Sequence, residues 1–203
     1  LNIIERLLPQ GYVADGRFQS IGKTEDGTVA PLAELCAQSN ADIAIVGDGG
    51  IGKTTFLQHL MEDAFLAPDG SARRYMGNRP VPFFIELNRC PDHIRDWYDD
   101  ALGKTNFITR YIGQIRENHA TLDSVSRQTL EEVEKEFQRI PSDGRPQYLL
   151  LLDGFNEVRT GGSIRADLSN EISVLHTYAN VRIITTSRET QAAYYASAFR
   201  NIR

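Results

Sequence analysis

The stretch ADIAIVGDGGIGKTTFLQHL, residues 41 to 60, determines what kind of fold this chain adopts. Its first six residues, Ala41–Val46, form a short apolar run of strand length. From Phe56 onward, apolar residues recur at helical spacing. Between the two lies GDGGIGKTT, which fits the phosphate-loop pattern G-x-x-x-x-G-K-[ST]. Because this pattern needs a strand before it and a helix after it, we expect the loop to bind the phosphates of a nucleotide.

The residues of this loop have distinct expected roles. Its glycines let the backbone curl so that successive N–H groups point at an anion. Lys53 is expected to reach the β- and γ-phosphates, and the Thr54 hydroxyl to bind Mg²⁺. Thr55 follows the metal ligand, and its position suits either an α-phosphate contact or an ordinary helix start. The nucleotide-binding residues that we predict are Gly47, Asp48, Gly49, Gly50, Ile51, Gly52, Lys53, Thr54 and Thr55.

The tripeptide GKT provides an internal control, since it occurs three times, beginning at Gly22, Gly52 and Gly103. Only the middle copy has a glycine five residues before its own glycine, an apolar run before that and a helical pattern after it. We therefore interpret the first and third copies as solvated turns.

A second apolar run, LLLLDGFNEV at residues 149–158, ends in acidic residues. A strand that ends in an acid near a phosphate loop is expected to hold Mg²⁺ opposite the Thr54 hydroxyl, at the carboxyl edge of the sheet. We assign that role to Asp153. Glu157 comes four residues later and is our candidate for polarising water near the γ-phosphate. A salt-bridged structural role is the alternative for Glu157.

A further apolar run, VRIITTS at residues 181–187, also ends in polar residues. Thr185, Thr186 and Ser187 suit γ-phosphate sensing, because they end a strand expected to lie beside the site. Arg188 follows them and is the candidate for a contact to the γ-phosphate or to a neighbouring subunit. The alternative is an ordinary surface arginine.

Strands and helices alternate along the chain. Near-continuous apolar strands are typical of a parallel sheet buried by helices on both faces. We therefore predict an α/β fold, the three-layer α/β/α sandwich of P-loop NTPases with a mostly parallel sheet. In the additional-strand (ASCE) order, the strand at 181–187 lies between the phosphate-loop strand and the LLLLD strand. The predicted strands are 41–46, 81–87, 147–153 and 181–187.

The remaining segments are less strongly patterned. Residues 1–40 are expected to form an arm or hairpin with helical turns at 31–38, packed on a domain at 41–203. Residues 92–141 are predicted to be helical in two or three pieces, and residues 189–203 to be helical. Because the chain starts at Leu1 and stops inside the last of these segments, we expect a fragment of a longer protein.

Composition limits the class of protein. A hydrophobic content of 41% in 203 residues is ample for one sizeable core. The net charge of −5, with no basic run longer than Arg73-Arg74, argues against a general nucleic-acid binder. No apolar stretch approaches the roughly 20 residues that span a bilayer. Cys36 and Cys90 lack metal or redox spacing, so we expect a cytoplasmic protein with reduced thiols and no membrane partner.

Three segments together, GDGGIGKTTFLQHL, LLLLDGFNEV and IITTSRE, resemble the NACHT branch of the STAND nucleotide-switch NTPases. The resemblance covers roughly residues 43–203. Its most specific mark is the small residue after Asp153 with polar or acidic residues at the third and fourth positions beyond. The family usually has an acid where this chain has Asn156, a departure that bears on the rate of hydrolysis more than on binding. The segment at Tyr12-Val13 resembles the arm that contacts the base.

The resemblance implies Mg²⁺ and ATP or ADP as cofactors, with GTP possible in place of ATP. In such proteins the diphosphate form is closed and monomeric, whereas the triphosphate form self-associates. Sensor and effector domains flank the nucleotide-binding domain. The resemblance also implies signal transduction roles such as innate immunity and antiphage defence.

Several other classes are compatible with a phosphate loop. A switch GTPase would carry [NT]-K-x-D and an ABC-type ATPase an LSGGQ-like signature, and the sequence has neither. A small-molecule kinase would need an arginine-rich lid, for which Arg73-Arg74 is a poor candidate. The main alternative is a regulatory module that binds nucleotide with little or no hydrolysis. A DNA-acting motor of related fold is a third, which the acidic balance disfavours.

Overall fold

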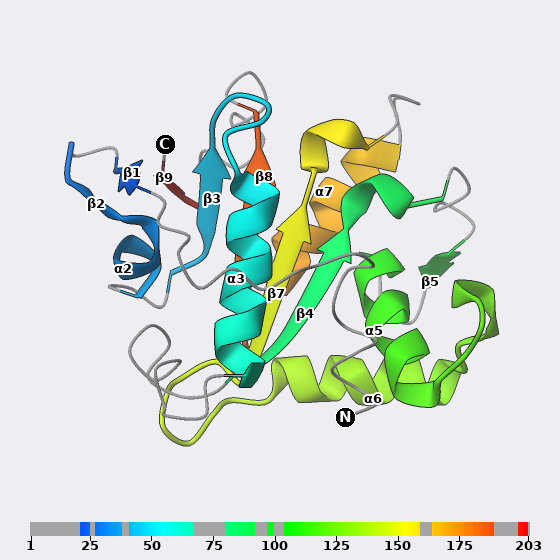
Figure 1. Cartoon of the computed structure of the whole chain (residues 1–203). Helices are drawn as coiled ribbons and strands as arrows, with labels where there is room; N and C mark the ends of the chain where they lie inside the picture. The colour runs from blue at the N-terminus through cyan, green and yellow to red at the C-terminus, as the bar shows by residue number, and fades with distance from the viewer. Residues whose placement is uncertain are drawn as a thin grey trace.

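A five-stranded sheet in which all neighbouring strands are parallel forms the centre of the computed structural model (Figure 1). Its order is β4-β7-β8-β3-β9. The strands are β3 (Ile43–Val46), β4 (Val81–Glu86), β7 (Tyr148–Asp153), β8 (Val181–Ser187) and β9 (Arg200–Ile202). The structure describes residues 21–24, 27–37, 41–66, 80–91, 97–99, 104–158, 164–188 and 199–202. The predicted fold class is confirmed, because β8 lies between the phosphate-loop strand β3 and the LLLLD strand β7.

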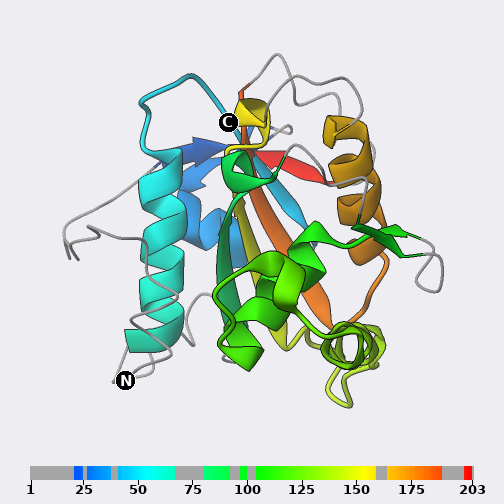
Figure 2. The same ribbon diagram turned by 90° about the vertical axis from the view of Figure 1, so that its right-hand side faces the viewer.

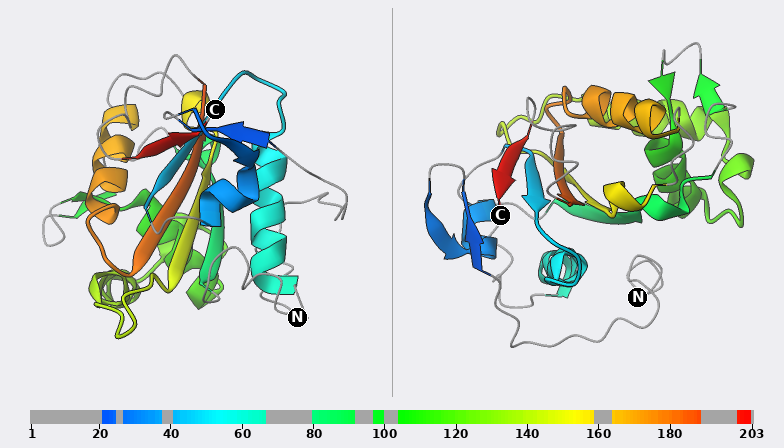
Figure 3. Two further views of the ribbon diagram at one scale, coloured as in Figure 1. Left: turned by 90° about the vertical axis from the view of Figure 1, so that its left-hand side faces the viewer. Right: turned by 90° about the horizontal axis from the view of Figure 1, so that it is seen from above.

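Helices cover both faces of this sheet. Every residue of β3 and β8 is buried, as expected for central strands of a sheet that is covered on both faces. Seen from above, α3 (Lys53–Leu66) lies on one face and α7 (Ile164–Leu175) on the opposite face (Figure 3). The helices α5 (Phe107–Glu117) and α6 (Arg127–Gln138) gather at the β4 end of the sheet (Figures 1 and 2). None of the helices in the described ranges combines the length and hydropathy that crossing a bilayer needs.

The part of the N-terminal segment that the structure describes forms a hairpin and a short helix. The strands β1 (Ile21–Lys23) and β2 (Val29–Pro31) form an antiparallel pair, and α2 (Leu32–Ala37) follows directly. Leu32 and Leu35 lie in this helix and are both buried in the main core. The predicted arm residues Tyr12-Val13 lie outside the described residues, as does the lid candidate Arg73-Arg74.

Two expectations about the flanking GKT copies were wrong. Gly22 and Lys23 of the first copy belong to β1, and Thr24, directly after the strand, is buried and accepts a hydrogen bond from the Thr28 N–H. The third copy contributes Lys104 and Thr105 to the strand β6, and Thr105 is buried. Apart from Gly103, which lies outside the described residues, both copies therefore lie in or next to small antiparallel pairs rather than in solvated turns. The polarity of a short segment does not reveal whether it packs against a core.

Two helical predictions also need correction. Residues 92–141 contain α5 and α6 as expected, but also the antiparallel pair β5 (Tyr98–Asp99) and β6 (Lys104–Thr105), and the 3-10 turn η3 (Leu122–Ser124). Residues 200–202 form β9 rather than a helix and pair in parallel with β3. Phe199 is buried and stacks on the His176 ring at 5.4 Å between centroids. Tertiary pairing therefore outweighs the weak local helix preference. Residues 189–198 lie outside the described part of the chain.

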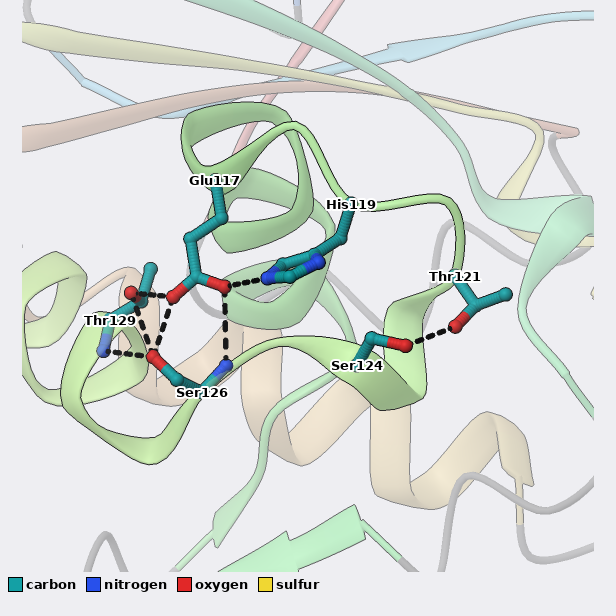
Figure 4. A network of polar contacts seen from close by, with 6 residues as sticks. All are labelled: Glu117, His119, Thr121, Ser124, Ser126 and Thr129. Atoms are coloured by element: carbon teal, nitrogen blue, oxygen red, sulfur yellow. Dashed lines mark hydrogen bonds and ion pairs between the residues drawn. The ribbon is translucent and has the colours of Figure 1, made fainter.

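A polar network joins the end of α5 to the start of α6 (Figure 4). Glu117, the last residue of α5, accepts hydrogen bonds from the hydroxyl groups of Ser126 and Thr129 and pairs with His119. Ser126 is the N-cap of α6 and accepts the Thr129 N–H at 3.2 Å. The hydrogen bonds from Ser126 and then Thr129 lower the pKa of Glu117 to about 2. The network thus connects the C-terminal end of α5 to the N-terminal end of α6.

A buried carboxylate connects α7 to the other end of α5. Glu171, which has no exposed surface, accepts the backbone N–H of Ile108 at 3.0 Å and that of Thr109 at 3.2 Å through Oε1. The first N–H groups of a helix have no partner within the helix, so a side chain from elsewhere must accept them when they are buried. Glu171 therefore fixes the first turn of α5 against the helix layer behind the sheet.

Candidate nucleotide-binding site

The carboxyl ends of the central strands bring the predicted site residues to one edge of the sheet. Parallel pairing places Val46 opposite Ser187, and Leu152 opposite Thr185. The loop that follows β3 and the turn that follows β7 therefore leave the sheet at the same end (Figure 1). The N–H of Gly47 donates to the Ser187 carbonyl at 3.2 Å, so the loop is anchored to β8 where it begins.

The phosphate loop turns sharply at two of its glycines. Gly50 and Gly52 have φ angles of 81° and 88°, a backbone conformation that residues other than glycine rarely adopt. Residues 48 to 51 are exposed, and α3 begins at Lys53. The Lys53 ammonium donates to the Gly47 carbonyl at 2.9 Å and to the Asp48 carbonyl at 2.6 Å. The lysine thus folds over the loop. Partial burial lowers its pKa, and the nearby Asp153 carboxylate opposes that effect.

The two predicted metal ligands contact each other directly. The Thr54 hydroxyl donates to Oδ2 of Asp153 at 2.8 Å, although the two residues are 99 positions apart in the sequence. Mg²⁺ in nucleotide sites is usually held by one or two protein oxygen ligands, with phosphate oxygens and waters completing its shell. A hydroxyl and a carboxylate that converge beside the phosphate loop fit this requirement.

The polar residues at the end of β8 are all hydrogen-bonded within the chain. The Thr185 hydroxyl donates to the Leu152 carbonyl at 3.1 Å, and that of Ser187 to the Arg188 carbonyl at 3.2 Å. The Thr186 hydroxyl donates to Oδ1 of Asp153 at 2.6 Å. The predicted γ-phosphate contacts would therefore require these hydroxyl groups to change partner.

Comparison with known families agrees with this geometry. The profile of the NACHT domain family matches residues 42–199. This chain belongs to the NACHT domain family. Its phosphate loop and strand order are accordingly those of a nucleotide-binding P-loop NTPase module. No curated protein matches the sequence.

Among solved structures, that of PCH-2 from C. elegans is similar, with a TM-score of 0.41 and 16% sequence identity. The match covers 85% of this chain and 39% of PCH-2, so the chain spans about two fifths of that protein. So distant a likeness carries no argument about function.

Glu157 of this NACHT domain returns to the site through a tight turn. Gly154 has a φ of 74° and turns the chain from β7 into the 3-10 turn η4 (Phe155–Glu157). The Glu157 carboxylate lies over this glycine, since a Cβ added there would be 3.3 Å from Oε2. Phe155 is fully buried and anchors the turn. Asn156 is half-buried between them.

One site residue was missed from the sequence. The side-chain amide of Asn88 donates to Oε2 of Glu157 at 3.3 Å. Asn88 lies in the 3-10 turn η1 (Leu87–Arg89), directly after β4, the neighbour of β7 in the sheet. The sequence did contain a signal for this residue, since Asn88 directly follows the apolar run VPFFIEL. Parallel strands end at a common edge of the sheet, so a polar residue at that point is a candidate for the site.

Two of the remaining predicted residues lie beside the loop. Arg188 is exposed, and its Nη2 lies 3.7 Å from the position that a Cβ on Gly49 would take. Its positive charge contributes to lowering the pKa of Lys53. Thr55 is exposed in the first turn of α3, a position that suits either of its two expected roles.

Proposed function

We propose that this NACHT domain binds a nucleoside triphosphate, preferably ATP, at the carboxyl edge of its sheet and hydrolyses it slowly with Mg²⁺. The observation that carries the proposal is the 2.8 Å contact between the Thr54 hydroxyl and the Asp153 carboxylate. It brings the end of the exposed phosphate loop close to the acid at the end of β7. Mg²⁺-nucleotide binding needs this arrangement of a phosphate loop and a strand-end acid.

The phosphate-binding roles follow from the donors that are available. Backbone N–H groups of residues 48–52 and the positive end of α3 attract the phosphates. Lys53 exchanges its two carbonyl partners for phosphate oxygens, and charge-assisted bonds of this kind are the stronger ones. Thr54 and Asp153 are the residues that would hold Mg²⁺. When bound, the ion neutralises charge on the phosphates.

Glu157 is the proposed residue that positions and polarises the attacking water. Its carboxylate is exposed, so water can reach it, and its charge acts on Lys53 in the same site. Arg188 is the proposed cation that stabilises negative charge on the γ-phosphate, because its guanidinium lies beside the loop at Gly49. The two side chains thus have complementary tasks, one toward water and one toward phosphate.

A second candidate function is a regulatory module that binds nucleotide and barely hydrolyses it. Asn156 favours it, since an amide replaces the usual acid and cannot act as a base. Glu157 also accepts a hydrogen bond from Asn88, which competes with any bond to water. Only a measurement of turnover separates the two functions.

For the protein as a whole, we propose a switch in signalling or defence, located in the cytoplasm. The NACHT domain, residues 41–203, would be its nucleotide-dependent part, and residues 1–40 an arm packed on it. Self-association in the triphosphate state would use flanking domains, and sensor and effector domains would set the stimulus and the output. Family membership supports this proposal.

The test is single-turnover hydrolysis of labelled ATP and of labelled GTP with Mg²⁺. Lys53→Ala should abolish binding, because it removes the cation of the cradle. Glu157→Gln should bind normally and release phosphate roughly 10²-fold more slowly, the lower range for loss of a general base. Glu132→Gln, an exposed acid on α6, is the matched control and should behave as the parent chain.

Each alternative outcome has a definite meaning. Tight binding by the parent chain without phosphate release would favour the regulatory module. Phosphate release that Glu157→Gln leaves unchanged would make Glu157 a structural acid. Faster release from GTP than from ATP would reverse the proposed preference for the base.

A further inference from the structure

A buried threonine lies behind the predicted metal ligand. Thr186, on β8, is only 1% exposed. Its hydroxyl donates to Oδ1 of Asp153 at 2.6 Å and accepts the backbone N–H of Gly154 at 3.0 Å. Thr54 contacts the other carboxylate oxygen, Oδ2, at 2.8 Å. Both oxygens of Asp153 are thus engaged by hydroxyl groups from two different elements.

The direction of these bonds is determined by chemistry. A backbone N–H can only donate, so the Thr186 oxygen must accept from Gly154. A hydroxyl has a single proton, and Thr186 directs it at Asp153. Oδ1 is therefore held toward β8, and Oδ2 is the oxygen that faces Thr54 and the phosphate loop.

We propose that Thr186 is a positioning residue that orients the Asp153 carboxylate for Mg²⁺ and the triphosphate. The inference rests on the proposed function of this site. Hydrogen-bonded partners behind a metal ligand restrict its rotation, and their loss typically weakens metal binding by about 10-fold to 100-fold. Thr186 meets the requirements for such a partner, because it is buried, belongs to a central strand and contacts the ligand oxygen that faces away from Thr54.

The neighbouring threonine shows that this contact is not a general property of the strand. Thr185 is also fully buried, but its hydroxyl donates to the Leu152 carbonyl, a bond between the β8 side chain and the β7 backbone. Thr186 alone of this adjacent pair reaches a carboxylate. Through the Gly154 N–H it also fixes the start of the turn that leads to Glu157.

The test is a Mg²⁺ titration of binding of a fluorescent ATP analogue, with the Mg²⁺ midpoint as readout. Thr186→Val, which keeps the shape but removes the hydroxyl, should raise the midpoint about 10-fold. Affinity for the analogue without Mg²⁺ should stay as in the parent chain. Thr186→Ser, which keeps the hydroxyl, should restore the parent midpoint. Thr109→Val, which removes an equally buried hydroxyl on α5, is the control and should leave the midpoint unchanged.

Three results would overturn the proposal. The first is a Mg²⁺ midpoint for Thr186→Val that lies within a factor of about two of the parent midpoint. Loss of a hydrogen-bonded partner behind a metal ligand should weaken metal binding by about 10-fold or more. The second is an equal rise in Thr109→Val, which would indicate general loosening. The third is a shift in Thr186→Ser as large as in Thr186→Val. If Thr186→Val does not unfold cooperatively, Thr186→Ala replaces it in the comparison with Thr186→Ser.

Failure of the proposed function would look different. In that case the parent chain would not bind the analogue at any Mg²⁺ concentration, or Lys53→Ala would bind it equally well. Normal Mg²⁺-dependent binding by the parent chain, together with an unchanged Thr186→Val midpoint, would overturn only the positioning role.

Discussion

Substitution of Gly154 by alanine tests how the turn after β7 holds Glu157. Gly154 has a φ of 74°, and a Cβ there would lie 3.3 Å from Oε2 and 3.5 Å from Cδ of Glu157. The substitution therefore strains the backbone and displaces the carboxylate. Gly144 provides a matched control, because its φ is 66° and a Cβ there would meet nothing within 4 Å. Gly144→Ala therefore strains only the backbone.

The expected magnitudes follow from these two effects. The left-handed conformation costs an alanine roughly 1–2 kcal/mol. Reduced entropy of the unfolded chain offsets about 0.4–1 kcal/mol of this cost. Gly144→Ala should thus lower the free energy of unfolding by about 1 kcal/mol. Gly154→Ala should lower it by about 1.5–2 kcal/mol, because the Glu157 side chain must also shift to relieve the 3.3 Å contact, at a cost of about 0.5–1 kcal/mol.

Urea unfolding of both variants measures the stability difference, and single-turnover phosphate release measures the functional one. Gly154→Ala should slow release by less than the roughly 10²-fold that a 1 Å misplacement of a catalytic group causes, because a contact at 3.3 Å displaces the carboxylate by only part of that distance. Nucleotide binding should persist in both variants, and Gly144→Ala should release phosphate like the parent chain. Equal destabilisation by the two variants would refute the contact with Glu157. Unchanged release in Gly154→Ala would refute the dependence of hydrolysis on this turn.

Three further predictions concern the helices around the sheet. Glu171→Ala should lower the free energy of unfolding by about 2 kcal/mol in urea, because buried N–H groups of α5 lose their acceptor, and Glu171→Gln should lower it less. Glu117 has a folded pKa of about 2 against an ordinary value of 4.5, so its stabilisation is present above pH 4.5 and is lost as the pH falls through 2. Glu117→Gln should flatten that part of the profile of urea midpoint against pH. Gly113→Val should lower the free energy of unfolding by about 2 kcal/mol through overpacking, since its Cβ would lie 2.6 Å from Val125 Cγ1. Val125→Ala should recover part of this loss in thermal unfolding.

The fold class and the main residues of the candidate site could be predicted from local sequence patterns. Residues 41–60 carry a strand, a phosphate loop and a helix in immediate succession, so local patterns suffice to recognise them. The runs that end at Asp153 and Ser187 can also be recognised locally. Strands buried on both faces of a parallel sheet do not alternate between apolar and polar residues. The order of the sheet followed from the identity of these motifs, and the structure agrees with it.

The contacts between side chains from different elements could not be predicted from the sequence, because they depend on how the strands pair. Residues 200–202 form a strand because β3 offers a free edge there, which overrides their local helix preference. Asn88 reaches Glu157 and Thr186 reaches Asp153 because neighbouring parallel strands end together in a definite register. A shift in register by a single residue would exchange the side chains on the two faces of a strand. The acids of the site, Asp153 and Glu157, can therefore be predicted from the sequence. The residues that hydrogen-bond to them depend on the pairing of the strands.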